Sequence, residues 1–247
     1  MTSEWIIGRN PVREALKAGR EINKIWMADH ARGSMRALLG LAKEQGVFVQ
    51  VVPKQKLDQM ADGKNHQGVI ASVAAHRYAE LEDLFRRAEE RDEPPFFVLL
   101  DELEDPHNLG AILRTADATG VHGVIIPKRR SSGLTSVVAK TSAGAIEYVP
   151  VVRVTNLART MDALKKRGIW FAGAAGEAEQ DYREAPLDMA IGLVIGNEGK
   201  GVSRLVKEKC DFLVRLPMAG KVSSLNASVA AALLMYEVYR KRRPSGV

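Results

Sequence analysis

The amino-acid sequence predicts an α/β protein built from two units, the larger of which contains a mostly parallel sheet. Apolar strand-like segments alternate with helix-like segments along both halves of the chain. An acidic stretch that ends in Arg-Asp-Glu-Pro-Pro separates the two halves, and adjacent prolines stop a helix and stiffen a connection. We therefore expect a first unit over residues 1–75, a linker over 76–95 and a second unit over 96–247.

The first unit has the pattern of a small α/β module. Apolar positions predict one helix after Pro11, and a second amphipathic pattern over residues 34–45 stops at Gly46. Strands are predicted at residues 22–27, 47–52 and 69–73.

A polar loop with two glycines, residues 62–68, lies between the last two of these strands. It is either a plain connecting turn or a contact loop for RNA. In the second interpretation Lys64, Asn65 and Gln67 donate hydrogen bonds to phosphate groups or base edges.

Composition and charge narrow the classes of function. Lysine and arginine outnumber aspartate and glutamate by 36 to 30, which permits a polyanionic partner. Residues 1–75 carry 11 basic and 7 acidic side chains, and residues 96–247 carry 21 and 16. The stretch between them carries 4 and 7, so two basic units flank an acidic connector, as expected if both units bind one polyanion.

Several classes of protein are disfavoured. Cys210 is the only cysteine, so the chain forms no intramolecular disulfide and no thiolate metal cluster, and we expect a structural buried thiol. The five histidines lack the spacing of a metal site, and no metal is expected. The N-terminus does not resemble a signal peptide, and no run of ~20 apolar residues predicts a membrane span. A cytosolic protein without a membrane partner is expected.

The second unit begins with an unbroken apolar run that is typical of a strand buried on both faces. Helices are expected up to Ala118, from a cap at Asn156 to near Gly168, around Leu205, and over a long alanine-rich segment that ends the chain. The predicted strands are residues 96–101, 121–127, 147–152, 169–174, 191–195 and 212–216.

Three glycine-bearing loops, residues 101–110, 196–201 and 217–224, follow strands of this unit. Ligands of open α/β sheets bind beyond the carboxyl ends of the strands, so the three loops can converge on one site. The spacing and late position of the 196–201 loop exclude a dinucleotide fingerprint, and no Walker loop is present. Its glycines would let the backbone approach a cofactor closely.

Polar residues cluster where the last helix begins, at Ser223, Ser224, Asn226 and Ser228. Such residues indicate either a helix cap or a small anion site at the helix N-terminus, and the stretch alone leaves both open. Arg114 lies six residues after Asn108, about two helical turns in, and could point toward the same end of the sheet.

Three segments, in this order and spacing, resemble the motifs of the SpoU (TrmH-like) RNA ribose 2′-O-methyltransferases. They are Asp-Pro-His-Asn-Leu-Gly-Ala-Ile-Leu-Arg-Thr-Ala at 105–116, Leu-Val-Ile-Gly-Asn-Glu-Gly-Lys-Gly at 193–201 and Leu-Pro-Met-Ala-Gly-Lys-Val-Ser-Ser-Leu-Asn-Ala-Ser at 216–228. The first unit, with His-Gln-Gly at 66–68, resembles the RNA-binding domain of the two-domain members. The whole chain is most similar to members that methylate a guanosine of 23S ribosomal RNA.

This resemblance implies a SPOUT-type α/β fold with a deep trefoil knot, S-adenosyl-L-methionine as the cofactor, RNA as the partner and a homodimer. Five residues would contact the cofactor, largely through backbone groups: Gly196, Asn197, Leu216, Met218 and Leu225. The catalytic and substrate set implied by the motifs is Arg114, Asn108, Glu198, Ser224 and Asn226.

The expected reaction is an in-line attack of a ribose 2′-hydroxyl on the activated methyl group. The resemblance assigns activation of this hydroxyl to Arg114. A guanidinium stays protonated at neutral pH, so we favour a role in which Arg114 binds the adjacent phosphate and stabilises the developing alkoxide. The sequence leaves open whether Arg114 also accepts the hydroxyl proton. Ser224 would help to hold that phosphate. The alternatives are another ribosomal position, transfer RNA, a non-catalytic RNA-binding protein and an enzyme acting on small nucleotides.

Overall fold

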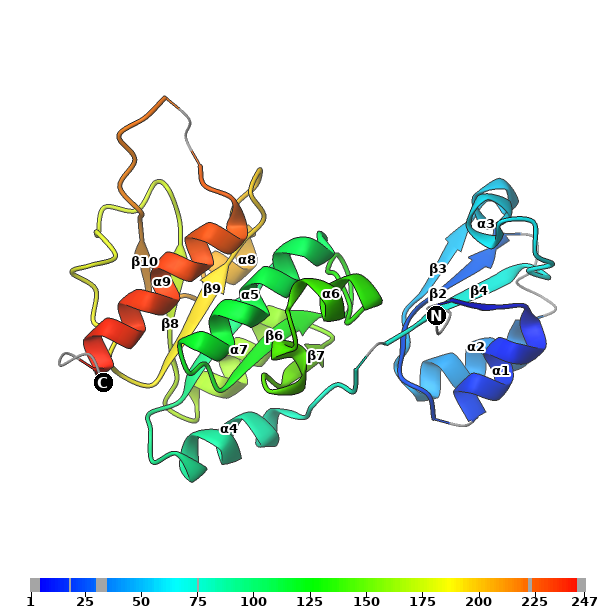
Figure 1. Ribbon diagram of the computed structural model, residues 1–247, viewed down its shortest axis with the longest axis horizontal. Coiled ribbons are helices and arrows are strands. Elements are labelled where there is room, and N and C mark those ends of the chain that lie inside the picture. Colours follow the sequence, from blue (N-terminus) through cyan, green and yellow to red (C-terminus); the bar gives the residue numbers. More distant parts are fainter. Residues whose placement is uncertain (1–4, 18, 30–34, 75, 222–223, 244–247) are drawn as a thin grey trace. The chain divides into compact units, whose positions relative to one another are not determined.

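The computed structural model describes residues 5–17, 19–29, 35–74, 76–221 and 224–243. The chain divides into two compact units, Met1–Arg77 with Gly133–Ser136, and Tyr78–Ser132 with Val137–Val247 (Figure 1). None of the helices in the described ranges is long and apolar enough to cross a membrane.

The first unit is a four-stranded mixed sheet with helices packed on it. The strands lie in the order β1-β4-β2-β3, with β2 and β3 parallel and the other pairs antiparallel. Their bounds are β1 Trp5–Ile7, β2 Ile22–Ala28, β3 Val49–Val52 and β4 Val69–Val73. The helices are α1 Arg9–Lys17, α2 Arg36–Glu44 and α3 Lys54–Ala61.

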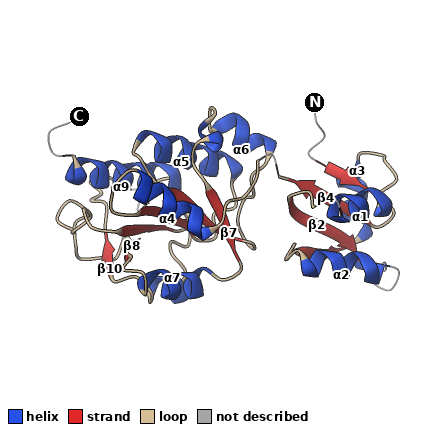
Figure 2. Ribbon diagram, turned by 90° about the horizontal axis from the view of Figure 1, so that it is seen from below, coloured by secondary structure: helices blue, strands red, loops and turns tan. Residues whose placement is uncertain are grey.

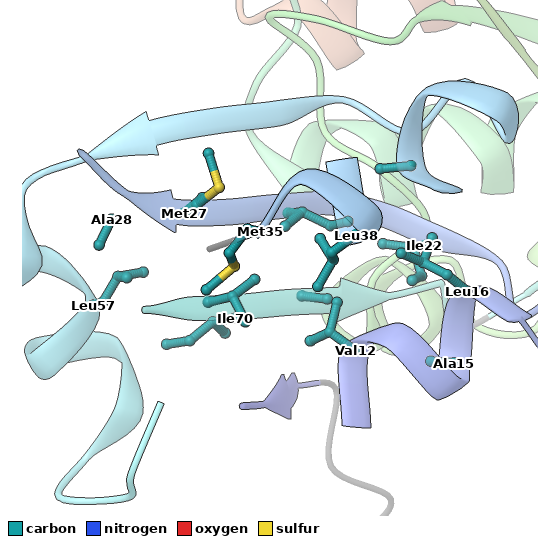
Figure 3. Close-up of a cluster of buried hydrophobic side chains, with 14 of the residues drawn as sticks. Val12, Ala15, Leu16, Ile22, Met27, Ala28, Met35, Leu38, Leu57 and Ile70 are labelled. Carbon is teal, nitrogen blue, oxygen red and sulfur yellow. The ribbon is translucent and has the colours of Figure 1, made fainter. Parts of the chain in front are cut away.

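The core of this unit forms because each helix turns a narrow apolar stripe toward the sheet. Val12 and Leu16 of α1, Leu38 of α2 and Leu57 of α3 are at most 2% exposed. They meet Ile70 and its neighbours on the strands (Figure 3). Burial of these side chains is the main favourable contribution to the stability of the unit.

The second unit is organised around a six-stranded sheet that is parallel throughout. The order of the strands is β10-β8-β9-β5-β6-β7. Their bounds are β5 Phe96–Leu100, β6 Gly123–Pro127, β7 Val151–Val154, β8 Trp170–Ala174, β9 Ile191–Ile195 and β10 Phe212–Val214. All residues of the central strands β5 and β9 are buried, which confirms the mostly parallel sheet predicted from their apolar runs.

Helices cover both faces of this sheet (Figure 2). On one face α5, Pro106–Ala118, packs against α9, Ala227–Arg242. On the other face α4 Leu81–Glu90, α7 Leu157–Lys165 and α8 Arg204–Lys207 share one apolar cluster with the strands. The short helices α6 Ser136–Thr141 and η3 Ala145–Glu147 lie between β6 and β7.

Two expectations about the segmentation are wrong. The supposed linker contains α4, whose Leu84 and Phe85 are 0% and 7% exposed in the core of the second unit, so that unit begins at Tyr78 rather than residue 96. The prolines mark the loop between α4 and β5, not the connection between units. The strand expected over residues 147–152 begins only at Val151, because η3 occupies Ala145–Glu147.

Candidate active site

A cavity of about 540 Å³ lies where β8, β9 and β10 end and α9 begins. Its walls are residues 174–176 after β8, 195–198 after β9, 214–218 after β10, and several residues from 224 to 230. This volume is within the range of small-molecule sites, ~300–1,000 Å³. The position, outside the carboxyl ends of parallel strands, is where ligands of open α/β sheets bind.

Gly196 sets the shape of the cavity wall at the end of β9. A Cβ atom at this position would lie 2.1 Å from the Gly201 carbonyl carbon and 2.2 Å from the Val202 nitrogen. The loop closes on itself here, because Asn197 and Gly201 exchange backbone hydrogen bonds of 3.2 and 2.7 Å. The tight closure therefore requires glycine at position 196.

Three polar side chains meet beside this cavity: one comes from the first turn of α5, one from the 196–201 loop and one from the N-cap of α9. The Asn108 Nδ2 group donates to Glu198 Oε1 at 2.5 Å. The Asn226 Nδ2 group donates to Asn108 Oδ1 at 2.9 Å and to Glu198 Oε1 at 3.0 Å. Asn108 is 6% exposed, so these hydrogen bonds satisfy an amide that would be costly to bury alone. We call these three residues the Asn-Glu-Asn cluster.

The start of α9 shows how Asn226 serves two roles. Its Oδ1 atom accepts hydrogen bonds from the backbone N–H groups of Ser228 at 2.9 Å and Val229 at 3.4 Å. Asn226 is therefore the N-cap of α9, which supports the cap interpretation of this polar segment. Its amide nitrogen remains available for the cluster. Ser223 lies outside the described residues.

Two further contacts connect the loops, and sequence reasoning missed both. The Asp101 carboxylate, 5% exposed at the end of β5, accepts a hydrogen bond from Ser203 N at 2.7 Å. The Asn197 side chain donates to the Glu102 carbonyl oxygen at 3.5 Å. An acidic residue directly after a buried strand was the available signal, because such a carboxylate can accept hydrogen bonds from a neighbouring loop.

All five residues expected to bind a cofactor line the cavity: Gly196, Asn197, Leu216, Met218 and Leu225. Glu198 and Ser224 line it as well. Residue 215 anchors the third loop, because Arg215 N donates to the Gln180 carbonyl at 2.9 Å and Tyr182 N donates to the Arg215 carbonyl at 3.1 Å. Loops far apart in the sequence therefore enclose one space.

Arg114 differs from the rest of the predicted set. It is exposed on α5, two turns beyond Asn108. Within the described part of the chain it neither lines the cavity nor makes a hydrogen bond or ion pair with the Asn-Glu-Asn cluster. Its side chain therefore faces outward from its own chain.

The predicted RNA-contact residues of the first unit lie on the loop between α3 and β4. Lys64, Asn65 and Gln67 are exposed. The buried His66 fixes this loop, because its Nδ1 atom accepts from Gly68 N at 2.9 Å and its Nε2 atom lies 2.8 Å from Asp58 Oδ1.

Comparison with protein families identifies both units. Residues 95–236 match the SpoU rRNA Methylase family, and residues 5–79 match a family described as RNA 2′-O ribose methyltransferase substrate binding. The first match spans more than half of the chain.

Individual relatives and solved structures agree with these matches. A Bacillus subtilis protein named "Putative TrmH family tRNA/rRNA methyltransferase YacO" is 61% identical over 98% of both chains. A Staphylococcus haemolyticus relative with the same family name is 55% identical over 98% of this chain and 97% of its own length. The crystal structure of the SpoU methyltransferase AviRb from Streptomyces viridochromogenes with AdoMet has a TM-score of 0.63 and 26% identity, covering 98% of this chain and 91% of that one. A TrmH/SpoU tRNA modifying enzyme of A. aeolicus has a TM-score of 0.56 and 29% identity, covering 67% of this chain and 85% of that one.

Proposed function

The chain belongs to the SpoU family of S-adenosylmethionine-dependent RNA ribose 2′-O-methyltransferases, and we propose that its substrate is a guanosine of 23S ribosomal RNA. The observation that carries the proposal is one cavity enclosed by the segments that follow β8, β9 and β10 and by the start of α9, with the Asn-Glu-Asn cluster connecting the start of α5 to it. No residue of the 101–110 loop, which the structure describes in full, lines the cavity itself. The ribosomal target rests on the resemblance of the whole chain to enzymes that modify this RNA.

The cavity fits S-adenosylmethionine by its size and by the chemistry of its walls. It combines apolar side chains of Leu216, Met218 and Leu225 with the exposed polar groups of a loop after β9. Because Gly196 has no side chain, its backbone N–H and C=O groups border the cavity directly. These peptide groups can bind a cofactor. We assign cofactor binding to these residues and to Asn197, largely through backbone groups.

When bound, the cofactor supplies a methyl group that its sulfonium has already activated for attack by an oxygen. The ribose 2′-oxygen loses its proton to water as it bonds to the methyl carbon, so the protein has to align the ribose and stabilise negative charge on this oxygen. Alignment in well-oriented systems contributes up to ~7–11 kcal/mol. The Asn-Glu-Asn cluster connects the start of α5, the 196–201 loop and the start of α9, so Asn108, Glu198 and Asn226 position the site.

Arg114 and Ser224 are the residues that we assign to the RNA backbone. A guanidinium has a pKa above ~12 and stays charged, so Arg114 binds the phosphate beside the target ribose and stabilises the developing alkoxide. Ser224 lines the cavity and donates a hydroxyl hydrogen bond to the same phosphate. In the first unit, exposed Lys64, Asn65 and Gln67 contact RNA away from the reacting sugar.

We propose a homodimer through the exposed face of α9. Val229, Leu233 and Tyr236 are 46%, 41% and 51% exposed, and their spacing places them on one side of the helix. Exposed apolar stripes of this kind are typical of interfaces. Arg114 lies on α5, which packs beside α9, so a second chain on this face would come close to it.

Sedimentation velocity tests the dimer. The wild type is expected to sediment as a dimer and Leu233→Glu as a monomer. Leu205→Glu changes an exposed leucine of α8, on the other face of the sheet, and should remain dimeric. A dimeric Leu233→Glu variant would contradict the proposed interface.

We further propose that the C-terminal part of the chain forms the deep trefoil knot expected from the resemblance. In support, α9 follows the edge strand β10 but packs against α5 and the interior strand β9. Shrinking an experimental backbone trace with its ends held fixed tests this, because an unknotted chain collapses to a line. A cytosolic location also stays a prediction.

Transfer with radiolabelled S-adenosylmethionine tests the substrate. We expect unmodified 23S ribosomal RNA to accept the label at one guanosine, mapped by nuclease digestion. Transfer RNA is the second candidate, because relatives are named for both RNAs. Labelling of transfer RNA alone would overturn the ribosomal assignment, and binding of RNA without transfer to any RNA would favour a non-catalytic RNA-binding protein.

A further inference from the structure

One face of the sheet in the first unit carries a group of aromatic side chains around a lysine. Trp5 of β1 and Lys24 of β2 both pair with Ser72 of β4, which lies between those strands. Residues that are directly opposite in a sheet project to the same face. Lys24 and Trp26 are two positions apart on β2, so they share this face as well.

The rings and the ammonium group form a continuous surface. The Trp5 and Trp26 rings have centroids 5.2 Å apart and an interplanar angle of 48°. The Lys24 Nζ atom lies 5.1 Å from the Trp26 ring centroid and 5.4 Å from that of Phe48. We call Trp5, Lys24, Trp26 and Phe48 the aromatic face.

This surface is accessible, unlike the alternating positions of the same strand. Trp5 is 36% exposed, and Lys24, Trp26 and Phe48 are half-buried. By contrast Ile25 and Met27 of β2 are 0% and 1% exposed and belong to the core. Trp26 also packs against the core of the unit, whereas Trp5 does not belong to that core. An exposed ring surface therefore remains around Trp5, and exposed apolar patches mark binding sites.

We propose that the aromatic face binds unpaired nucleotides of the substrate RNA by stacking, which rests on the proposed function in RNA methylation. Every base has a π-face, and flat aromatic side chains on a β-sheet stack bases that are not held in a duplex. Lys24 supplies a positive charge among the rings, suited to the adjoining phosphates. Residues 1–75 carry 11 basic and 7 acidic side chains, which complements a polyanion.

The chemistry selects single-stranded RNA over duplex RNA. In an RNA duplex the bases stack on one another and their faces are covered. A duplex therefore offers the aromatic side chains only phosphates and sugars. The aromatic face consequently gives the enzyme a means of choosing unpaired segments of its substrate RNA, in addition to the 62–68 loop.

Tryptophan fluorescence in the full-length protein tests this site directly. The chain has three tryptophans, so Trp170→Phe leaves Trp5 and Trp26 as the only reporters. In that background an unpaired oligoribonucleotide should quench the emission, and a hairpin of equal length with a minimal loop should quench it less. Trp170 itself is 49% exposed in the second unit, so its replacement is the matched control and should leave RNA affinity unchanged.

Affinity measurements with substitutions at position 5 separate stacking from simple burial. Trp5→Leu keeps an apolar side chain without a π-face, and we expect RNA affinity to fall about 5- to 150-fold, since stacking contributes ~1–3 kcal/mol per base. Trp5→Phe should retain most of the affinity, and Lys24→Gln should weaken binding and reduce its dependence on salt. Melting temperatures of each variant check that the first unit stays folded.

Wild-type RNA affinity in Trp5→Leu, or unchanged fluorescence on adding the unpaired oligoribonucleotide, would overturn the aromatic face as an RNA site. Either result together with normal methyl transfer by the wild type leaves the proposed function standing. Absence of transfer to any RNA by the wild type would instead contradict the proposed function itself.

Discussion

Gly196→Ala should abolish most of the affinity for S-adenosylmethionine. The added Cβ would lie 2.1 Å from the Gly201 carbonyl carbon and 2.2 Å from both the Gly201 oxygen and the Val202 nitrogen. Ordinary contacts between carbon atoms are ~3.5–4.0 Å, so the overlap exceeds an ångström. All three atoms belong to the backbone, and the clash can be relieved only by opening the 196–201 loop.

The free-energy cost of Gly196→Ala can be worked out from the contacts that the added Cβ breaks. Opening the loop breaks the two backbone hydrogen bonds between Asn197 and Gly201, which contribute about 1 kcal/mol each. Residual crowding adds about 1–3 kcal/mol. Together these terms give a loss of roughly 3–5 kcal/mol in the cofactor-binding form, so affinity should decrease about 100- to 4,000-fold.

Calorimetric titration of S-adenosylmethionine into wild type, Gly196→Ala and Gly199→Ala provides the assay. Gly199 lies in the same loop, but a Cβ there would meet only the Asn197 Oδ1 atom, at an ordinary 3.5 Å. Gly199→Ala should therefore bind the cofactor within about threefold of wild type. Equal affinity of Gly196→Ala and wild type would refute the assignment of this cavity to the cofactor.

Four other predictions address single residues. With cofactor and RNA saturating, Arg114→Ala should lower turnover about 100-fold, as for loss of one electrostatic donor, while calorimetry shows unchanged cofactor affinity; near-normal turnover would exclude the assigned role. Asn226→Ser keeps a capping oxygen but loses the amide, so urea unfolding should show it about 1 kcal/mol more stable than Asn226→Ala, whereas both should lose turnover. Burial raises the pKa of the Cys210 thiol from 9.0 to about 12, so Ellman's reagent should label it about a thousandfold more slowly in the folded protein than in urea. Burial lowers the pKa of His122 from 6.5 to about 4. Between these pH values the unfolded state binds more protons than the folded state, so the free energy of unfolding falls as the pH drops from 6.5 toward 4. In His122→Gln this part of the pH dependence, measured by urea unfolding, should disappear.

The parallel sheet could be predicted because its central strands, β5 and β9, are five residues long and apolar throughout. Residues 191–195 coincide with β9, and Asn156 is the N-cap of α7, with its Oδ1 atom 2.9 Å from Arg159 N. These features depend on local chemistry: strand burial on both faces and hydrogen bonding within one helical turn.

Elements with weaker local signals were missed. The strand β1 has three residues and α3 has eight, too short for periodicity to identify them among polar neighbours. The acidic charge of residues 76–95 and their adjacent prolines favoured a linker, although Leu84 and Phe85 of α4 pack into the core. Packing in the core places α4 in the second unit, and the charge of a segment does not reveal such packing.

The cofactor residues were expected from motif resemblance, and the loop positions from the rule that parallel strands end at one edge. The contacts of the Asn-Glu-Asn cluster could not be obtained in this way. Asn108 and Asn226 are separated by 118 positions, and their hydrogen bond depends on the packing of α9 against α5. The contact between Asp101 and Ser203 likewise forms only when β5 and β9 are neighbours.

Alkaline hydrolysis of the methylated product tests most directly whether this chain modifies ribose. RNA incubated with the protein and methyl-labelled S-adenosylmethionine is digested with alkali, which cleaves through free 2′-hydroxyls and cannot cleave beside a methylated one. We predict that the label is recovered in alkali-resistant dinucleotides. Label in mononucleotides would show that the methyl group went to a base, contradicting the account of the site.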